Sequence, residues 1–266
     1  MQNTFQSYLQ EIMKNGGAIL TKSLKSWRAG IDYETNFWES WFSTRGLEWP
    51  EDYINRLQPQ EMPDWIQNLL PTNQSFFRIL DVGSGPITKT GQIIPGRSVD
   101  ITATDPLARH YDAIMEKFDV APPLRTTFSF AEDLSARFPN DHFDLILCTN
   151  ALDHAIEPVW GIVEMLICLK IGGLVYLGHR RNEAEFEDYS GFHQWNFDEV
   201  EGSFIVWNKE RRINVTELLS GFAAVATTLH GDHIGVNIVK NQGLPIDAHD
   251  YQRQARATLL GCLFSL

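Results

Sequence analysis

Three histidines in the second half of the chain are the side chains best suited to proton transfer. His154 follows an apolar run in "NALDHAIEP", His179 ends another in "GLVYLGH", and His193 lies in the polar stretch "HRRNEAEFEDYSGFHQWNF". Histidine titrates near neutral pH, so each imidazole could accept a proton from a reacting group. A surface or loop-stabilising role is the alternative for each ring. The sequence therefore offers His154, His193 and His179 as candidate catalytic residues.

A divalent metal is a second use for part of this segment. His179, Glu183 and His193 carry ligand types that could converge from one loop. The spacing of four residues between His179 and Glu183 would suit a helix, yet the segment follows a predicted strand directly. We therefore predict a site without a metal. The acidic residues from Glu183 to Asp188 are then a solvated run, or a surface that contacts a cationic or hydroxyl-rich molecule.

A glycine turn in "DVGSGP", residues 81–86, is the candidate ligand-binding loop. Gly83 and Gly85 let the backbone approach a ligand closely or adopt positive φ. A dinucleotide fingerprint would need a third glycine and a helix whose N-terminus receives the pyrophosphate. Thr88 occupies the third position, and Gly91, Pro95 and Gly96 follow, so any helix after the turn is predicted to be short or missing. The turn is therefore poorly suited to binding a phosphate group.

Two carboxylates accompany the glycine turn. Asp81 lies two residues before Gly83, where it would repel a pyrophosphate but would suit an ammonium or a sulfonium group. Asp105 ends the next predicted strand, twenty residues past Gly85, where a carboxylate can accept both hydroxyls of a ribose. The pair predicts a positively charged nucleoside as ligand.

The elements that would position these residues alternate between strand and helix from about residue 76, as in an open α/β sheet. Pro106 and Pro158 stand at plausible helix starts. The predicted Gly231-Asp232 turn joins an antiparallel pair of strands, and Asn214 is the predicted cap of a short helix. We predict five parallel strands (76–82, 100–105, 126–130, 143–150, 173–179), crossover helices (106–118, 157–170), a hairpin turning at 208–210 within 202–215, a helix from 214 and a hairpin within 224–240.

Residues 1 to about 70 show no strand pattern and are rich in aromatic side chains, among them Trp38, Trp41, Phe42 and Trp49. We predict a helical cap over 1–70 and a ligand-binding domain over 71–266. The aromatic residues of the cap would pack on the sheet domain. A lid that excludes water from a cofactor is the more specific interpretation.

Composition limits the partners and the compartment. The 266 residues are 43% apolar, and 34 acids against 22 Lys plus Arg leave a net charge of −12. Scattered basic residues argue against a nucleic-acid partner and favour an uncharged or cationic small molecule. Cys148, Cys168 and Cys262 lie in apolar contexts without metal-type spacing, which indicates buried free thiols. Charged residues interrupt the first thirty positions and no apolar run reaches membrane length, so we expect a cytoplasmic protein without a membrane partner.

Between about residues 76 and 240 the sequence resembles the class I S-adenosylmethionine-dependent methyltransferases. "DVGSGP" matches the E/D-x-G-x-G motif of that family, Asp105 its acidic end of strand two, "ALDH" its "LEH" and "LKIGG" its "LKPGG". The resemblance implies a Rossmann-like, doubly wound, seven-stranded α/β sheet, here five parallel strands plus an antiparallel C-terminal pair with the N-terminal helical cap. It also implies S-adenosylmethionine as the cofactor.

The same resemblance assigns cofactor-binding residues. Asp81, Gly83 and Gly85 correspond to the loop beside the methionine part, and Asp105 to the ribose-binding acid. Phe130 stands where the family often has an adenine-binding Asp, so adenine recognition passes to Glu132, Asp133 or backbone groups. The neighbouring positions assigned with them are Pro106 and Asn150.

The predicted function is an S-adenosylmethionine-dependent methyltransferase that acts on a small-molecule acceptor. The Pro-Pro-aromatic signature of DNA amino-methyltransferases is absent, since "APPL" ends in Leu124. O-methylation of a sugar or of a surface-polysaccharide precursor is the preferred acceptor chemistry. A non-catalytic S-adenosylmethionine-binding or scaffolding protein is the first alternative. A nicotinamide-dependent short-chain oxidoreductase is the second, weakened because no tyrosine is followed four residues later by lysine. The oligomeric state stays open.

Overall fold

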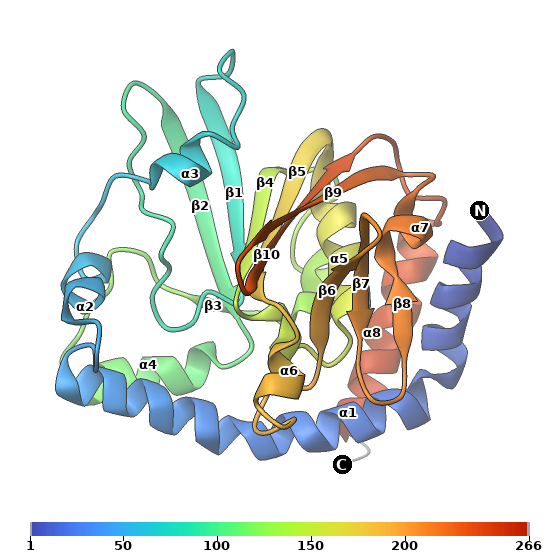
Figure 1. The fold of residues 1–266 in the computed structure, drawn as a ribbon. Helices are drawn as coiled ribbons and strands as arrows, with labels where there is room; N and C mark the ends of the chain where they lie inside the picture. Colours follow the sequence, from blue (N-terminus) through green and yellow to red (C-terminus); the bar gives the residue numbers. More distant parts are fainter. Residues whose placement is uncertain (1, 265–266) are drawn as a thin grey trace.

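A computed structural model describes the backbone of residues 2–264, and the side chains of residues 5–14, 23–247 and 250–261. Its centre is a seven-stranded sheet in the order β3-β2-β1-β4-β5-β10-β9 (Figure 1). The strands are β1 (Phe76–Val82), β2 (Ser98–Asp105), β3 (Thr127–Phe128), β4 (Phe143–Thr149), β5 (Leu169–Arg180), β9 (Ala223–His230) and β10 (His233–Lys240).

The first five of these strands are parallel, and β10 runs antiparallel to both β5 and β9. The predicted fold class is therefore confirmed. All five predicted parallel strands are present, although β3 keeps only two residues of the predicted five and β5 begins four residues earlier. The reversal of strand order between β1 and β4 places a ligand-binding crevice at the carboxyl ends of these strands.

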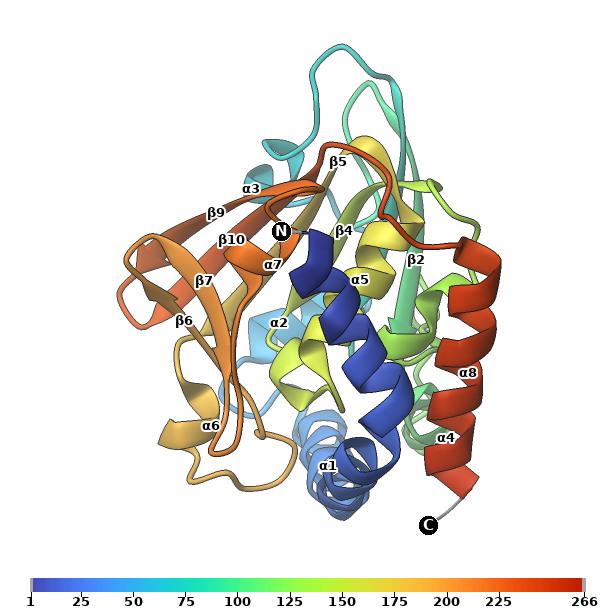
Figure 2. The same cartoon turned by 90° about the vertical axis from the view of Figure 1, so that its right-hand side faces the viewer.

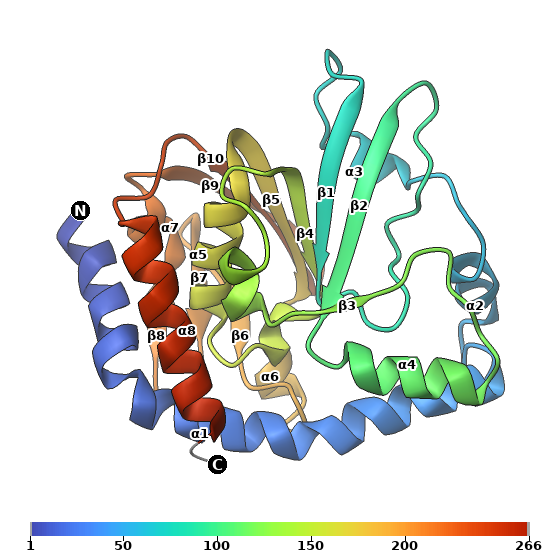
Figure 3. The ribbon, with the colours of Figure 1, turned by 180° about the vertical axis from the view of Figure 1, so that it is seen from behind.

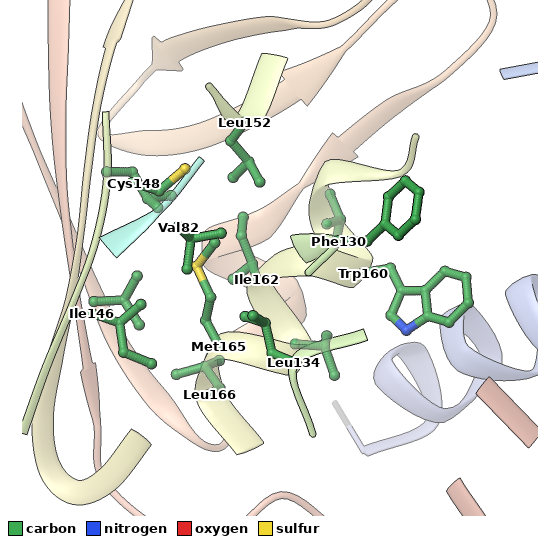
Figure 4. Close-up of a cluster of buried hydrophobic side chains, with 14 of the residues drawn as sticks. Val82, Phe130, Leu134, Ile146, Cys148, Leu152, Trp160, Ile162, Met165 and Leu166 are labelled. Carbon is green, nitrogen blue, oxygen red and sulfur yellow. The ribbon is translucent and has the colours of Figure 1, made fainter. Parts of the chain in front are cut away.

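One face of the sheet is covered by α5 (Pro158–Cys168) and by the 3-10 turn η1 (Ala131–Ala136). Every residue of α5 is buried, because η1 and α8 (Ala248–Phe264) lie against it as well as the sheet. Figure 4 shows Ile162, Met165 and Leu166 of α5 gathered with Val82 and Ile146 of the strands. Packing in this apolar core fixes the position of β1 and β4 relative to the crevice.

The segment between β1 and β2 contains no helix within its described residues 83–97, as the glycines and Pro95 predicted. The opposite face of the sheet is covered there by this loop and by α3 (Asp64–Gln67). Ile66 of α3 and Ile94 of the loop pack on Phe77 and Ile79 of β1. An N-terminal segment therefore takes the place of the usual crossover helix.

The N-terminal region is helical, as predicted, and its first helix is long. In Figures 1 and 3, α1 (Gln2–Thr44) runs below the carboxyl ends of the strands and meets α4 (Ala108–Lys117). Figure 2 shows its first half beside α8. Trp27 and Trp41 of α1 belong to the same apolar cluster as the sheet residues. Helix α2 (Pro50–Arg56) follows.

A second, three-stranded antiparallel sheet carries β6 (Asn196–Val200), β7 (Ser203–Trp207) and β8 (Arg212–Asn214). The predicted hairpin at 202–215 is confirmed, and Asn208 Oδ1 accepts the Glu210 and Arg211 N–H groups at its turn. Asn214 caps α7 (Val215–Leu219) as predicted. Strand β6, the short α6 (Glu183–Phe186) and α8 were not predicted; α6 lies in the segment interpreted as a polar loop, and β6 begins at its end.

Cys148 and Cys168 are buried free thiols, as predicted, whereas the side chain of Cys262 lies outside the described residues. Among the helices in the described part of the chain, none combines the length and the apolar character needed to cross a membrane.

Candidate functional site

A cavity of about 650 Å³ lies at the carboxyl ends of β1, β2 and β4, and residues of α1 and α2 contribute to its lining. It is the place where an open parallel sheet binds ligands. Asp133 and His179 are absent from its described lining. The other candidate residues line it: Asp81, Gly83, Gly85, Asp105, Pro106, Glu132, Asn150, His154 and His193.

The glycine turn forms the floor of the cavity. Gly83 and Gly85 have φ angles of 71° and 66°, in the left-handed region. A Cβ at position 83 would lie 2.4 Å from the Ala151 Cβ, and one at position 85 would lie 2.9 Å from the Trp38 ring. The Gly83 and Ser84 N–H groups donate to the Thr104 carbonyl. Glycine is therefore required at both positions, because the φ angles are positive and Ala151 and Trp38 lie against the turn.

Asp81 is buried at the end of β1. Its Oδ2 accepts the Thr88 hydroxyl at 2.5 Å. Burial raises the pKa of Asp81 to about 6, while the Thr88 hydrogen bond and the Arg56 charge act in the opposite direction. Thr88, which breaks the dinucleotide pattern, thus orients the first carboxylate of the site.

Asp105 is buried at the end of β2. Its two oxygens accept the Gly85 N–H at 3.1 Å and the Leu107 N–H at 2.8 Å. Burial raises the pKa of Asp105 to about 7; the Leu107 N–H lowers it and the neighbouring Glu34 carboxylate raises it further. Asp105 thus joins the glycine turn to the start of α4, and each of its oxygens keeps a lone pair for a further donor.

The residues proposed around an adenine lie in different environments. Phe130 lines the cavity and packs against Trp27, with ring centroids 5.3 Å apart. Glu132 is buried and its Oε1 accepts the Glu157 N–H at 2.8 Å; burial raises its pKa to about 7. Asp133 pairs with Arg137 at 3.2 Å. Glu132 therefore already has a structural partner at the cavity wall.

Asn150 and the chain that follows it turn the end of β4 toward the cavity. Asn150 has a φ of 48°, and its N–H donates to the Gly178 carbonyl at 2.9 Å. The short turn η2 (Leu152–His154) comes next. It brings His154 into the lining of the cavity, whereas Asp153 is buried and absent from the described lining.

The three candidate histidines meet around Asp153, a residue that the sequence analysis did not single out. Asp153 Oδ2 lies 2.7 Å from His193 Nδ1 and 3.4 Å from His154 Nε2, and these two ring nitrogens are 3.2 Å apart. His179 Nδ1 lies 3.8 Å from Asp153 Oδ1. The acidic residue inside "LDH" was the sequence signal that could have identified Asp153.

Burial and neighbouring charges shift the pKa values of Asp153, His193 and His179 in different directions. Burial alone would raise the pKa of Asp153, but His154, His193 and His179 together lower it to about 2. For His193, burial favours the neutral ring, but the hydrogen bond to Asp153 and the charges of the neighbouring acids together outweigh it and raise its pKa. Burial lowers the pKa of His179 to about 4, so its ring is neutral near pH 7.

The N-terminal helices add cavity residues that the sequence analysis did not assign. Trp38 Nε1 donates to Glu34 Oε1 at 2.7 Å, which holds the indole ring over the Gly85 turn. Arg56 of α2 is buried, pairs with Asp52 at 2.9 Å and donates to the Ile87 carbonyl. The aromatic density of residues 36–57 was the only sequence signal for this wall.

The chain was compared with family models, curated proteins and solved structures. No family model and no curated protein matches it. Among solved structures, the CurJ carbon methyltransferase is 20% identical with a TM-score of 0.44, over 65% of this chain and 50% of the CurJ chain. A SAM-dependent methyltransferase from Aquifex aeolicus is 13% identical with a TM-score of 0.39, over 66% of this chain and 87% of that one.

The cyclase SpnF is also similar, at 22% identity and a TM-score of 0.33, over 45% of this chain and 44% of that one. The present chain thus spans half the length of CurJ and less than half of SpnF. At these identities the likeness concerns the fold alone. The strand order and the antiparallel β10 establish the fold class independently.

Proposed function

We propose that this chain binds S-adenosylmethionine in the cavity and transfers its methyl group to a small-molecule acceptor. The observation that carries the proposal is the placement of two buried carboxylates, Asp81 and Asp105, at the ends of neighbouring strands in one cavity. Two carboxylates suit a ligand that is cationic and rich in hydroxyl donors. A pyrophosphate would meet both negative charges and no helix N-terminus at the turn.

The residues present fit this cofactor. Gly83 and Gly85 line the cavity, and Ala151 and Trp38 occupy the space that a Cβ at these positions would fill, so the turn forms a tightly packed wall against which a ligand can lie. Asp105 would accept the ribose hydroxyls through its remaining lone pairs, and Asp81 would face the ammonium end. Phe130 and Trp27 would offer ring faces to the adenine.

When bound, S-adenosylmethionine supplies a methyl carbon activated by its sulfonium, and the carbon–sulfur bond breaks as the acceptor's electron pair bonds to the carbon. The chain's own task is to align the acceptor and to manage its proton. His154 and His193 line the cavity, the buried Asp153 bonds to His193, and the acceptor oxygen would lie beside the two rings. His179 is 1% exposed, and we propose that it supports Asp153 from behind.

The acceptor end of the cavity favours a ring-shaped molecule with hydroxyl groups. Tyr33, Phe37, Trp49 and Phe192 contribute aromatic faces to the lining, and the charge of −12 favours an uncharged or cationic ligand. Aromatic faces pack against the apolar face of a sugar ring, while the histidine cluster can bind its hydroxyls. We propose a sugar, such as a surface-polysaccharide precursor, as the acceptor. A non-catalytic S-adenosylmethionine-binding protein is the second candidate, and Phe130 in place of the adenine-binding acid favours it.

Calorimetric titration with S-adenosylmethionine tests the first step. Asp105→Ala removes two charge-assisted hydrogen bonds, so affinity should fall about 100-fold or more. Asp100→Ala, at the exposed opposite end of β2, is the matched control and should bind like the unchanged protein. Circular dichroism verifies folding, because Asp105 also accepts two backbone N–H groups.

Unchanged affinity in a folded Asp105→Ala protein would contradict the ribose assignment. Release of S-adenosylhomocysteine over a panel of sugars and sugar nucleotides then tests turnover. Turnover in the presence of a sugar supports the methyltransferase. Tight cofactor binding without turnover on any acceptor supports the non-catalytic candidate, and absence of binding excludes both.

A further inference from the structure

Three possible ligand atoms lie close together at the cavity wall, two of them on histidines that line the cavity. Asp153 Oδ2, His154 Nε2 and His193 Nδ1 form a triangle with sides of 2.7, 3.2 and 3.4 Å. Asp153 and His154 come from η2, after β4, whereas His193 comes from the loop that precedes β6. The tertiary fold therefore gathers two imidazoles and one carboxylate, all able to bind a metal ion.

Hydrogen bonds alone do not satisfy this triangle. If His193 Nδ1 carries the proton, it can donate to Asp153 Oδ2 and to His154 Nε2. The third side then joins two lone pairs at 3.4 Å, those of Asp153 Oδ2 and His154 Nε2. If His154 Nε2 carries a proton as well, it faces the N–H of His193 at 3.2 Å. One side of the triangle is repulsive in either arrangement, whereas a cation between the three atoms would attract all three lone pairs.

The separations agree with coordination to one ion. Nitrogen and oxygen ligands about 2.1 Å from a metal, at angles of about 90–110°, lie roughly 3.0–3.4 Å apart. Two of the three sides fall in this range and the third is slightly shorter. Two His and one carboxylate are also a set that leaves coordination positions open.

A second observation is an unpaired carboxylate oxygen behind the triangle. Asp153 is 1% exposed, and its Oδ1 has no hydrogen-bond partner among the residues that the structure describes. The nearest ring, His179, offers only a 3.8 Å approach, and both of its nitrogens are likewise unpaired within the described chain. The Glu183 carboxylate also acts electrostatically on this cluster. A buried carboxylate with an orphan oxygen and a second acid nearby calls for a cation.

We propose that Asp153, His154 and His193 bind a divalent first-row cation such as Mn²⁺ or Zn²⁺. His154 and His193 line the cavity and keep about a fifth of their side-chain surface exposed, so the open coordination positions face the cavity. This revises the prediction of a metal-free site, and Asp153 and His154 take the places that Glu183 and His179 had in the alternative considered from sequence. The next step rests on the proposed function. The cation would bind an oxygen of the acceptor and favour the deprotonated form of that oxygen, which points to a hydroxyl acceptor.

Metal binding is tested without any acceptor. The full chain is stripped with a chelator and titrated with Mn²⁺, whose free signal is followed by electron paramagnetic resonance, and with Co²⁺, whose visible absorption reports nitrogen and oxygen ligation. We expect one cation per chain in the unchanged protein. His193→Ala and His154→Ala should each weaken affinity about 100-fold. His230→Ala, an exposed histidine on β9, should bind like the unchanged protein.

The result that overturns the proposal is a folded, unchanged protein that binds no cation, or a His193→Ala protein that binds as tightly as the unchanged one. Thermal unfolding of each variant by circular dichroism shows whether it is folded. If Asp153→Asn does not fold, the two histidine variants still decide. Calorimetry with S-adenosylmethionine on the stripped protein separates the two proposals: cation binding without cofactor binding refutes the proposed function alone, and the converse refutes the metal site alone.

Discussion

Substitution of Gly83 by alanine tests whether the turn after β1 is as tightly built as the structure indicates. The new Cβ would lie 2.4 Å from the Ala151 Cβ, and the backbone at position 83 has a φ of 71°. Gly96 offers a matched control, because its φ is also 71° while a Cβ there would meet nothing within 4 Å. The two variants therefore share the backbone strain and differ in the clash.

The expected magnitudes follow from these two terms. A left-handed backbone conformation destabilises an alanine by about 1–2 kcal/mol. Alanine also restricts the unfolded chain more than glycine does, which stabilises the folded state by about 0.4–1 kcal/mol. Gly96→Ala should therefore destabilise the protein by about 1 kcal/mol or less. Overpacking adds about 1–3 kcal/mol at position 83. The sum is about 1–4 kcal/mol, and at about 2–4 °C per kcal/mol for a chain of this size Gly83→Ala should lower Tm by roughly 2–16 °C.

Thermal unfolding and calorimetric titration with S-adenosylmethionine measure the two consequences. Gly83→Ala should lose most of its cofactor affinity because the loop must move into the cavity, whereas Gly96→Ala should keep it. The double variant Gly83→Ala/Ala151→Gly removes the clash and should recover most of the Tm difference. Equal Tm values for Gly83→Ala and Gly96→Ala, or no recovery in the double variant, would refute the packing that the structure gives to this turn.

Two further predictions concern stability away from the cavity. Burial raises the pKa of Glu164 to about 7, above its unfolded value near 4.3, so the protonated carboxyl stabilises the fold below about pH 4 and this contribution is lost as pH rises through 7. Glu164→Gln keeps an acceptor for the Ser135 N–H. In urea unfolding, the free energy of unfolding of this variant relative to the unchanged protein should rise by about 3 kcal/mol between pH 4 and pH 8. Identical pH profiles for the two proteins would contradict this prediction. Asn214→Ala removes the side-chain acceptor of the Glu217 N–H and should cost about 1 kcal/mol in the same assay, whereas no loss would show that the cap contributes nothing.

The glycine-turn half of the site was accessible from the sequence because its signals are local. Asp81, Gly83 and Gly85 are contiguous with β1, and Asp105 ends the adjacent strand. Parallel neighbours end at one edge of a sheet, so the pattern of the strands places these residues together. Thr88 and Pro95 likewise predicted the missing helix, since both act through the backbone of their own segment.

The histidine half was only partly accessible. His154 and His193 were candidates, but the sequence analysis grouped His193 with His179 and Glu183, which are closer along the chain. In the structure Asp153 joins His154 to His193 across 39 residues, because α6 and β6 turn the intervening segment back onto η2. The spacing of residues along a loop without predicted secondary structure does not indicate which distant residues the loop will contact.

The sequence by itself determined the strands, their helical crossovers and the glycine turn, since side-chain periodicity and backbone preference act over a few residues. Only the tertiary structure decided that Trp38 of α1 covers Gly85, that Arg56 lies near Asp81, and that Asp153 meets His193. These contacts join segments tens of residues apart. Their geometry depends on how whole elements pack, and packing is a property of the complete apolar core and not of any one segment.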